Sequence, residues 1–212
     1  AGLMLVTLRF ASGLSSADYV TAQGWRLATL ACCPLHPRGG CGFARHGTYA
    51  RVSPPGTRIA RWYCPTGHCT FSLLPDHLAA RFPGTLSEIE QVVATVEQAK
   101  SLEAAADRLR GEDITLPSAL RWVRRRVAPV RRLLTIVVGL FPQWLQGCVP
   151  QIIAVRERLV CGEALMLLRA LAAVHLQSLA PPLGFLAPPV LAGERKPAVQ
   201  HHMGPDPPAG FG

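Results

Sequence analysis

The fold of this chain is decided by two stretches, Cys33-Pro-Leu-His-Pro-Arg-Gly-Gly-Cys41 and Cys64-Pro-Thr-Gly-His-Cys-Thr-Phe71. Each opens with Cys-Pro and contains the glycine that a tight turn around a metal requires. A zinc ribbon holds one metal between two such turns, with a β-hairpin between them. Residues 42–63 have a suitable length for that hairpin. The sequence therefore predicts a small, β-rich zinc ribbon over residues 32–76.

Tetrahedral zinc needs four ligands. The two turns offer six candidate side chains: Cys33, His36, Cys41, Cys64, His68 and Cys69. We expect Cys33, Cys41 and Cys64 to bind the ion together with His68, or with Cys69 in place of His68. His36 is the less favoured alternative in the first turn. No Asp or Glu lies between the first and last of these residues, so a structural zinc is expected rather than a catalytic one. Buried cysteines without a metal, or a rubredoxin-like iron centre, are the remaining interpretations.

Composition and charge limit the class of protein. The 212 residues suffice for one or two domains, and a content of 49% hydrophobic and 17% charged residues is that of a globular protein. The 22 Lys and Arg outnumber the 13 Asp and Glu, which suits a polyanionic partner, nucleic acid before an acidic membrane surface. The longest apolar run, residues 133–141, is far too short to span a bilayer, so no membrane partner is expected. No export signal is visible, so the seven cysteines are interpreted as reduced thiols or metal ligands of a cytoplasmic protein.

The pattern after the ribbon is helical. Ser87 and Glu90 have the spacing of a capping box, which predicts a helix over residues 88–99. Ser101 is expected to cap a second helix, a break follows at Gly111, and a third helix is expected to run to about residue 127.

These elements give an α+β fold class, with the ribbon first and an all-α part after it. The expected segments are an N-terminal segment over 1–31, the zinc ribbon over 32–76, a helix-turn-helix over 85–128, a helical region over 129–179 and a disordered Pro/Gly-rich tail over 180–212.

The third helix of this region is predicted to have two different faces. Its core face is a seam of apolar residues at helical spacing: Leu116, Leu120, Val123 and Val127. The opposite face is basic, because eight Arg and only two acids lie between residues 108 and 132. Such a helix is typical of a recognition helix in the DNA major groove, with a solvated charged face as the alternative.

The expected DNA-binding residues are Ser118, Arg121, Arg124, Arg125 and Arg126 on this helix, with Arg45 and Arg51 of the ribbon hairpin extending the basic surface. Arg121 and Arg125 point directly away from the seam and are expected to reach base edges. Arg124 and Arg126 flank that face and are expected to contact phosphates.

Three stretches resemble a known family: Cys41-Gly-Phe-Ala-Arg-His-Gly-Thr-Tyr-Ala-Arg51, Arg61-Trp-Tyr-Cys-Pro65 and Thr70-Phe-Ser-Leu-Leu-Pro-Asp76. They are similar to the zinc ribbon at the front of bacterial insertion-sequence transposases. The chain departs from that family in its longer first turn and in Gly67, which stands where the usual Cys-Pro-x-Cys turn has its second cysteine. The resemblance implies an origin in transposition, with a transposase or a second copy of the chain as a further partner.

A catalytic function is not expected. Transposase chemistry needs three carboxylates that hold two metal ions, but beyond residue 128 the only acids are Glu157, Glu163, Glu194 and Asp206. No Gly-rich phosphate loop or nucleophile motif is present. The sequence therefore predicts a nucleoid-associated protein that binds double-stranded DNA, carries structural zinc and lacks a nuclease domain. A zinc-ribbon adaptor for protein interactions, or a transcriptional regulator, is the alternative.

Overall fold

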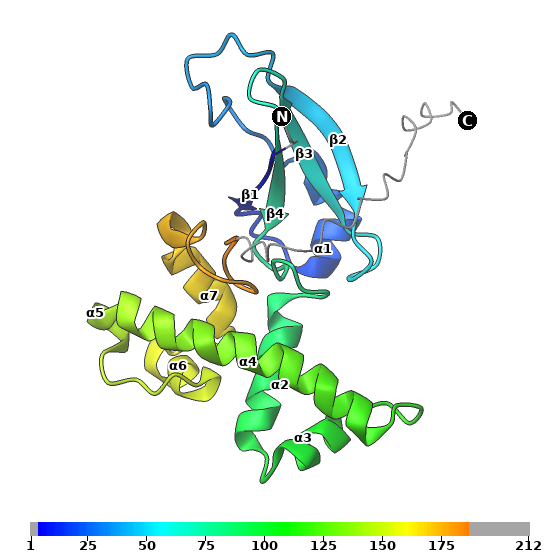
Figure 1. The fold of residues 1–212 in the computed structure, drawn as a ribbon, viewed down its shortest axis with the longest axis vertical. Helices are drawn as coiled ribbons and strands as arrows, with labels where there is room; N and C mark the ends of the chain where they lie inside the picture. Colours follow the sequence, from blue (N-terminus) through cyan, green and yellow to red (C-terminus); the bar gives the residue numbers. More distant parts are fainter. Residues whose placement is uncertain (1–3, 187–212) are drawn as a thin grey trace, which may run out of the picture.

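The computed structural model describes residues 4–186 and has a mixed α+β architecture (Figure 1). One end is a four-stranded sheet in the order β1-β4-β3-β2, and the other end is helical. The strands are β1 (Met4–Phe10), β2 (Ala44–Ala50), β3 (Arg58–Cys64) and β4 (Cys69–Pro75). The helices are α1 (Ser16–Thr21), α2 (Leu86–Gln98), α3 (Leu102–Leu109), α4 (Leu116–Leu140), α5 (Pro142–Leu145), α6 (Ile152–Leu159) and α7 (Ala164–Leu171), with short 3-10 helices η1 (Gly24–Arg26) and η2 (Ala173–His175).

The sheet contains the predicted hairpin, strand β4 within the predicted ribbon, and strand β1 outside it. The antiparallel pair β2–β3 connects the two cysteine turns, and β4 follows the second turn directly. The additional strand is β1, which pairs in parallel with β4 from Met4 opposite Cys69 to Phe10 opposite Pro75. The segment 1–31 is therefore not separate from the ribbon, because its first strand completes the sheet and leaves β4 buried along its whole length.

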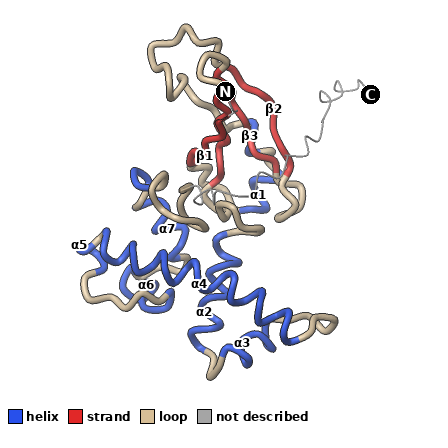
Figure 2. The backbone as a smooth tube through the Cα atoms, in the orientation of Figure 1, coloured by secondary structure: helices blue, strands red, loops and turns tan. Residues whose placement is uncertain are grey.

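The two faces of the sheet pack against different parts of the chain. One face, with Ala60 and Leu73, packs on Ala28 and on the loop that precedes the first cysteine turn. On the other face Ile59 and Leu74 join a large apolar core that continues through the helices. Figure 2 shows the strands, with α1 beside them, at one end and helices α2 to α6 at the other.

The helix caps confirm one sequence prediction and correct another. Ser101 caps α3 as expected, with its hydroxyl accepting from the Ala104 N–H at 3.1 Å. The capping box of α2, however, is formed by Thr85 and Glu88. The predicted box at Ser87 and Glu90 is wrong, because both residues lie inside the helix and Glu90 is fully buried.

Helix α4 is much longer than expected. It continues past Val127 to Leu140 with Pro129 in its interior. An interior proline removes one backbone hydrogen bond and costs about 3 kcal/mol. Here the buried seam continues on both sides of it, through Val123 and Val127 to Val130 and Leu134, so that tertiary packing offsets the loss.

Two acids on α2, the buried Glu90 and the half-buried Glu97, hold the starts of two short helices in the predicted helical region. Glu97 accepts from the Ile152 and Ile153 N–H groups at 2.9 and 3.0 Å at the start of α6. Glu90 accepts from the Ala164 and Leu165 N–H groups at 2.8 and 2.7 Å at the start of α7. A carboxylate at a helix N-terminus satisfies unpaired N–H groups and interacts favourably with the helix dipole.

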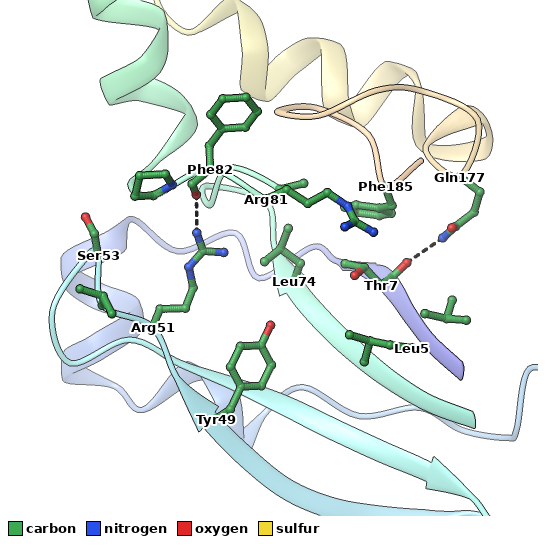
Figure 3. A pocket seen from close by; sticks show the side chains of 14 residues that line it. Leu5, Thr7, Tyr49, Arg51, Ser53, Leu74, Arg81, Phe82, Gln177 and Phe185 are labelled. Carbon is green, nitrogen blue, oxygen red and sulfur yellow. Dashed lines mark hydrogen bonds between the residues drawn. The ribbon is translucent and has the colours of Figure 1, made fainter. Parts of the chain in front are cut away.

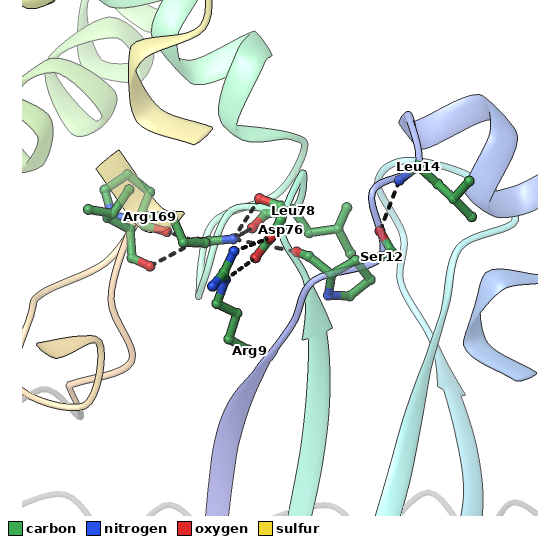
Figure 4. A network of polar contacts seen from close by, with 9 residues as sticks. Arg9, Ser12, Leu14, Asp76, Leu78 and Arg169 are labelled. Atoms are coloured by element: carbon green, nitrogen blue, oxygen red, sulfur yellow. Dashed lines mark hydrogen bonds and ion pairs between the residues drawn. The ribbon is translucent and has the colours of Figure 1, made fainter. Parts of the chain in front are cut away.

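A buried arginine joins the sheet to the C-terminal part of the fold (Figure 4). Arg169 of α7 is fully buried, and burial lowers the pKa of its guanidinium to about 9, which leaves it charged at neutral pH. It donates to the carbonyls of Asp76 at 3.0 Å and Leu78 beyond the end of β4, and to those of Pro182 at 2.7 Å and Leu183 at 3.0 Å. Residues 180–186 are therefore packed into the fold, which corrects the predicted start of the tail. The rest of that tail lies outside the described residues.

We expect Arg169→Met to lower the free energy of unfolding by at least about 3 kcal/mol. The substitution keeps the volume of the side chain but leaves several buried carbonyls without a donor, each at a cost of about 1–3 kcal/mol. Urea denaturation followed by circular dichroism measures the change. The control is Arg131→Met on the exposed face of α4, which should change stability by no more than about 0.5 kcal/mol. Equal effects of the two substitutions would contradict this role of Arg169.

Candidate metal centre

Three cysteines and one histidine form a compact group of possible metal ligands. The ligand atoms of Cys33, His36, Cys41 and Cys64 all lie within 4.8 Å of one another. His36 Nδ1 is 3.6 Å from the Cys33 sulfur and 3.3 Å from the Cys64 sulfur. In a tetrahedral zinc site neighbouring ligand atoms are separated by about 3.5–3.8 Å. The four residues are therefore close enough to hold a metal ion after small adjustments.

The first cysteine turn brings His36 and Cys41 to the same point. The His36 N–H donates to the Cys33 carbonyl at 3.1 Å, and the Gly39 N–H donates to the His36 carbonyl at 2.9 Å. Gly39 and Gly40 then have φ angles of 81° and 79°, in the left-handed region that favours glycine. This reversal returns the chain to Cys41, which begins the approach to β2.

The second turn explains why His36 is the fourth member of the group. The Gly67 N–H donates to the Cys64 sulfur at 3.3 Å. A Cβ atom at Gly67 would lie 2.6 Å from the Leu35 Cδ1, 3.4 Å from the Cys64 sulfur and 3.6 Å from the His36 Cε1. Gly67 occupies the position of the second cysteine in the usual ribbon turn. Here Leu35 and the His36 imidazole from the first turn fill the space that this cysteine side chain would take.

The structure does not bring His68 or Cys69 into the group. His68 is exposed, with a left-handed φ of 45°, and its carbonyl accepts from the Met4 N–H at 3.0 Å at the start of β1. Cys69 is buried at the start of β4, where its sulfur contacts the Thr70 carbonyl at 4.0 Å. The prediction for these two residues is corrected in favour of His36, because the second turn points His68 outward and places Cys69 in the sheet.

The thiols of the group have different acidities. Burial opposes ionisation of Cys33, but hydrogen bonds from the His36 side chain and from the backbone N–H groups of Leu35 and His36 outweigh it and lower the pKa of the thiol to about 7. Burial raises the pKa of Cys64 despite the hydrogen bond from Gly67. A cation stabilises thiolates in such surroundings. Three thiolates and one imidazole occupy all four positions of a tetrahedral ion, which is typical of a structural site.

The predicted DNA-binding residues fall into two groups. Arg121, Arg124 and Arg125 are exposed on α4, as expected, and Ser118 is half-buried on the same helix. Arg126 is half-buried, with its guanidinium 4.0 Å above the ring of Trp122.

The two hairpin arginines have structural contacts. Arg45 donates to the carbonyls of Trp25 at 2.6 Å and of Arg26 and Ala28 at 3.4 Å, so it anchors the loop after α1. Arg51 is half-buried and donates to the Phe82 carbonyl at 2.6 Å.

Comparison of the chain with protein-family models, with curated proteins and with solved structures found no match. None of the helices within residues 4–186 combines the length and the apolar character needed to cross a membrane.

We expect the full chain to bind one zinc ion, and His36→Ala or Cys64→Ser to lose it. Elemental analysis after removal of excess metal measures the zinc content. The matched controls are His68→Ala and Cys69→Ser, which should keep the ion because neither side chain belongs to the group. Full zinc content in His36→Ala, or loss of zinc in His68→Ala, would contradict this ligand set.

Proposed function

We propose that this chain is a DNA-binding protein whose sheet is stabilised by a structural zinc ion. The observation that carries the proposal is the charge of α4. This helix contains six Arg and no Asp or Glu. Five of the six are exposed, and within the described residues none of the six forms an ion pair. Cations without an acidic partner on one helix face suit a polyanion, whose counterions are released on binding.

The packing around α4 supports a role in recognition. Helices α2, α3 and α4 pack against one another, and residues 110–115 join α3 to α4 by a short connection. The buried side of α4 includes Val123 and Val127 of the predicted seam, while Arg121 and Arg125 lie one turn apart on the exposed side. This arrangement is compatible with a helix-turn-helix in which α4 is the recognition helix.

The proposed zinc ion has a structural role. The cysteine turns lie at the end of the sheet away from the helices (Figure 1). A cluster of buried residues around them contains Phe71 and four cysteines, with Phe43 and Trp62 packed against it. Such a small apolar cluster gives limited stability alone, and structural zinc contributes on the order of 10 kcal/mol to small domains of this kind. The ion would thus hold the two cysteine turns together, and with them the ends of β2 and β3.

A protein-interaction adaptor is the second candidate. It is favoured by three exposed apolar side chains near the end of α4 and after it: Ile136 at 51%, Trp144 at 46% and Val149 at 54% of their full exposure. Exposed apolar side chains are typical of protein interfaces. Binding to DNA should weaken steeply with salt, whereas an apolar interface should not. The resemblance to the ribbon of insertion-sequence transposases favours the first candidate.

We expect the zinc-loaded chain to bind duplex DNA with an affinity that falls steeply as salt increases. Combined Arg124→Gln, Arg131→Gln and Arg132→Gln should make the logarithmic slope shallower by about 3, because each phosphate contact contributes about 0.9. Fluorescence anisotropy of a labelled duplex at several salt concentrations measures the slope. Arg26→Gln, an exposed arginine on η1, is the control and should leave the slope unchanged. A triple variant with the slope of the unmodified chain would contradict the role of α4.

A further inference from the structure

Two adjoining hollows lie between the sheet and the helices. The first has a volume of about 550 Å³ and lies between β1, the end of β2 and the loop at residues 80–83 (Figure 3). The second has a volume of about 610 Å³ and lies between the same loop and the first turns of α4. Phe82 and Pro83 line both hollows. The two hollows therefore adjoin at these two residues, and together they are here called the sheet–helix groove.

The sheet–helix groove is lined by cations and, within the described residues, by no acid. Arg51 and Arg81 line the first hollow, and Arg121, Arg125 and Arg126 line the second. Arg81 is exposed, and its side chain makes no hydrogen bond or ion pair with another described residue. Its φ of 58° is a left-handed conformation that costs a non-glycine residue roughly 1 kcal/mol or more.

Aromatic rings line the groove together with these cations. Tyr49 lies in the first hollow, Phe82 at the junction and Trp122 in the second hollow. Figure 3 shows Tyr49 and Arg51 directed from the end of β2 toward the loop that carries Arg81 and Phe82. Proteins that bind single-stranded nucleic acid combine these two features, because cations follow the backbone while flat rings stack on the bases.

We propose that the sheet–helix groove binds single-stranded nucleic acid. In this arrangement Arg81, Arg121 and Arg125 contact phosphates, while Phe82 and Trp122 stack on bases. Each hollow has the volume of a small-ligand site, roughly 300–1,000 Å³. That size admits individual nucleotides of a flexible strand.

The inference rests on the proposed nucleic-acid-binding function and deepens it. Arg124, Arg131 and Arg132 are exposed on α4 and do not line the groove. They remain available to the phosphates of a duplex while a strand lies in the groove. Arg121 and Arg125 are available to either ligand, so the two modes are separated by substituting residues that serve one of them: Arg81 and Phe82 for the single strand, Arg131 and Arg132 for the duplex.

The test is a pair of anisotropy titrations of the zinc-loaded full chain, with a labelled mixed-sequence single strand and with its duplex. Arg81→Gln combined with Phe82→Leu should weaken single-strand binding about tenfold, because loss of one stacked base and one phosphate contact acts on that mode alone. Duplex affinity should change less than twofold. The matched control is the Arg131→Gln, Arg132→Gln variant, which should weaken duplex binding and leave single-strand binding within twofold.

A second measurement is independent of the stability of these variants. A base stacked on Trp122 should quench the fluorescence of the unmodified chain, and Trp122→Phe should remove this part of the quenching.

The inference is overturned if the groove substitutions leave single-strand binding unchanged or weaken both modes equally. It is also overturned if the chain binds duplex but no single strand, a result that leaves the proposed function intact. Binding of neither nucleic acid overturns both proposals.

Discussion

The position of the sheet relative to the helices depends on one buried cation, the Arg169 guanidinium. It donates to carbonyls beyond the end of β4 and to Pro182 and Leu183, so that three separate segments meet at one side chain. Asp76 is held from its other side by Arg9 of β1, with both contacts at 2.8 Å. A buried charge is tolerated only when it is fully hydrogen-bonded. These hydrogen bonds hold α7, the end of β4 and residues 182–183 against one another.

Strand β4 runs between the carbonyls that Arg169 binds and the candidate metal centre. It runs from Cys69, directly opposite Cys64, to Pro75, next to the carbonyls that Arg169 binds, and all its residues are buried. A metal ion bound by Cys33, His36, Cys41 and Cys64 would hold the end of β3 that pairs with the start of β4, while Arg169 binds carbonyls at and beyond the other end of β4.

The sequence was informative wherever a short-range pattern determines the structure. The hairpin between the cysteine turns, the Ser101 cap and the buried Val123 and Val127 of α4 all follow from local spacing. The sequence named His36 only as the less favoured ligand. Its place in the group follows from two features read together: Gly67 leaves the second turn one ligand short, and the first turn contains a histidine that can replace it. Long-range features could not be read in this way. The pairing of β1 with β4 and the five carbonyls around Arg169 join residues far apart in the sequence. Pro129 disfavours a helix locally, and it stays inside α4 because tertiary packing outweighs that preference.

The most direct test of the central claim, that nucleic acid binds where α4 faces the sheet, is ultraviolet cross-linking of the zinc-loaded chain followed by peptide mapping. A single strand that continues into a duplex offers both kinds of ligand at once. The account predicts cross-links at residues 81–83 and at Trp122, with none on α1 or α6. Cross-links confined to the exposed apolar side chains after residue 136, or a uniform distribution over the surface, would contradict it.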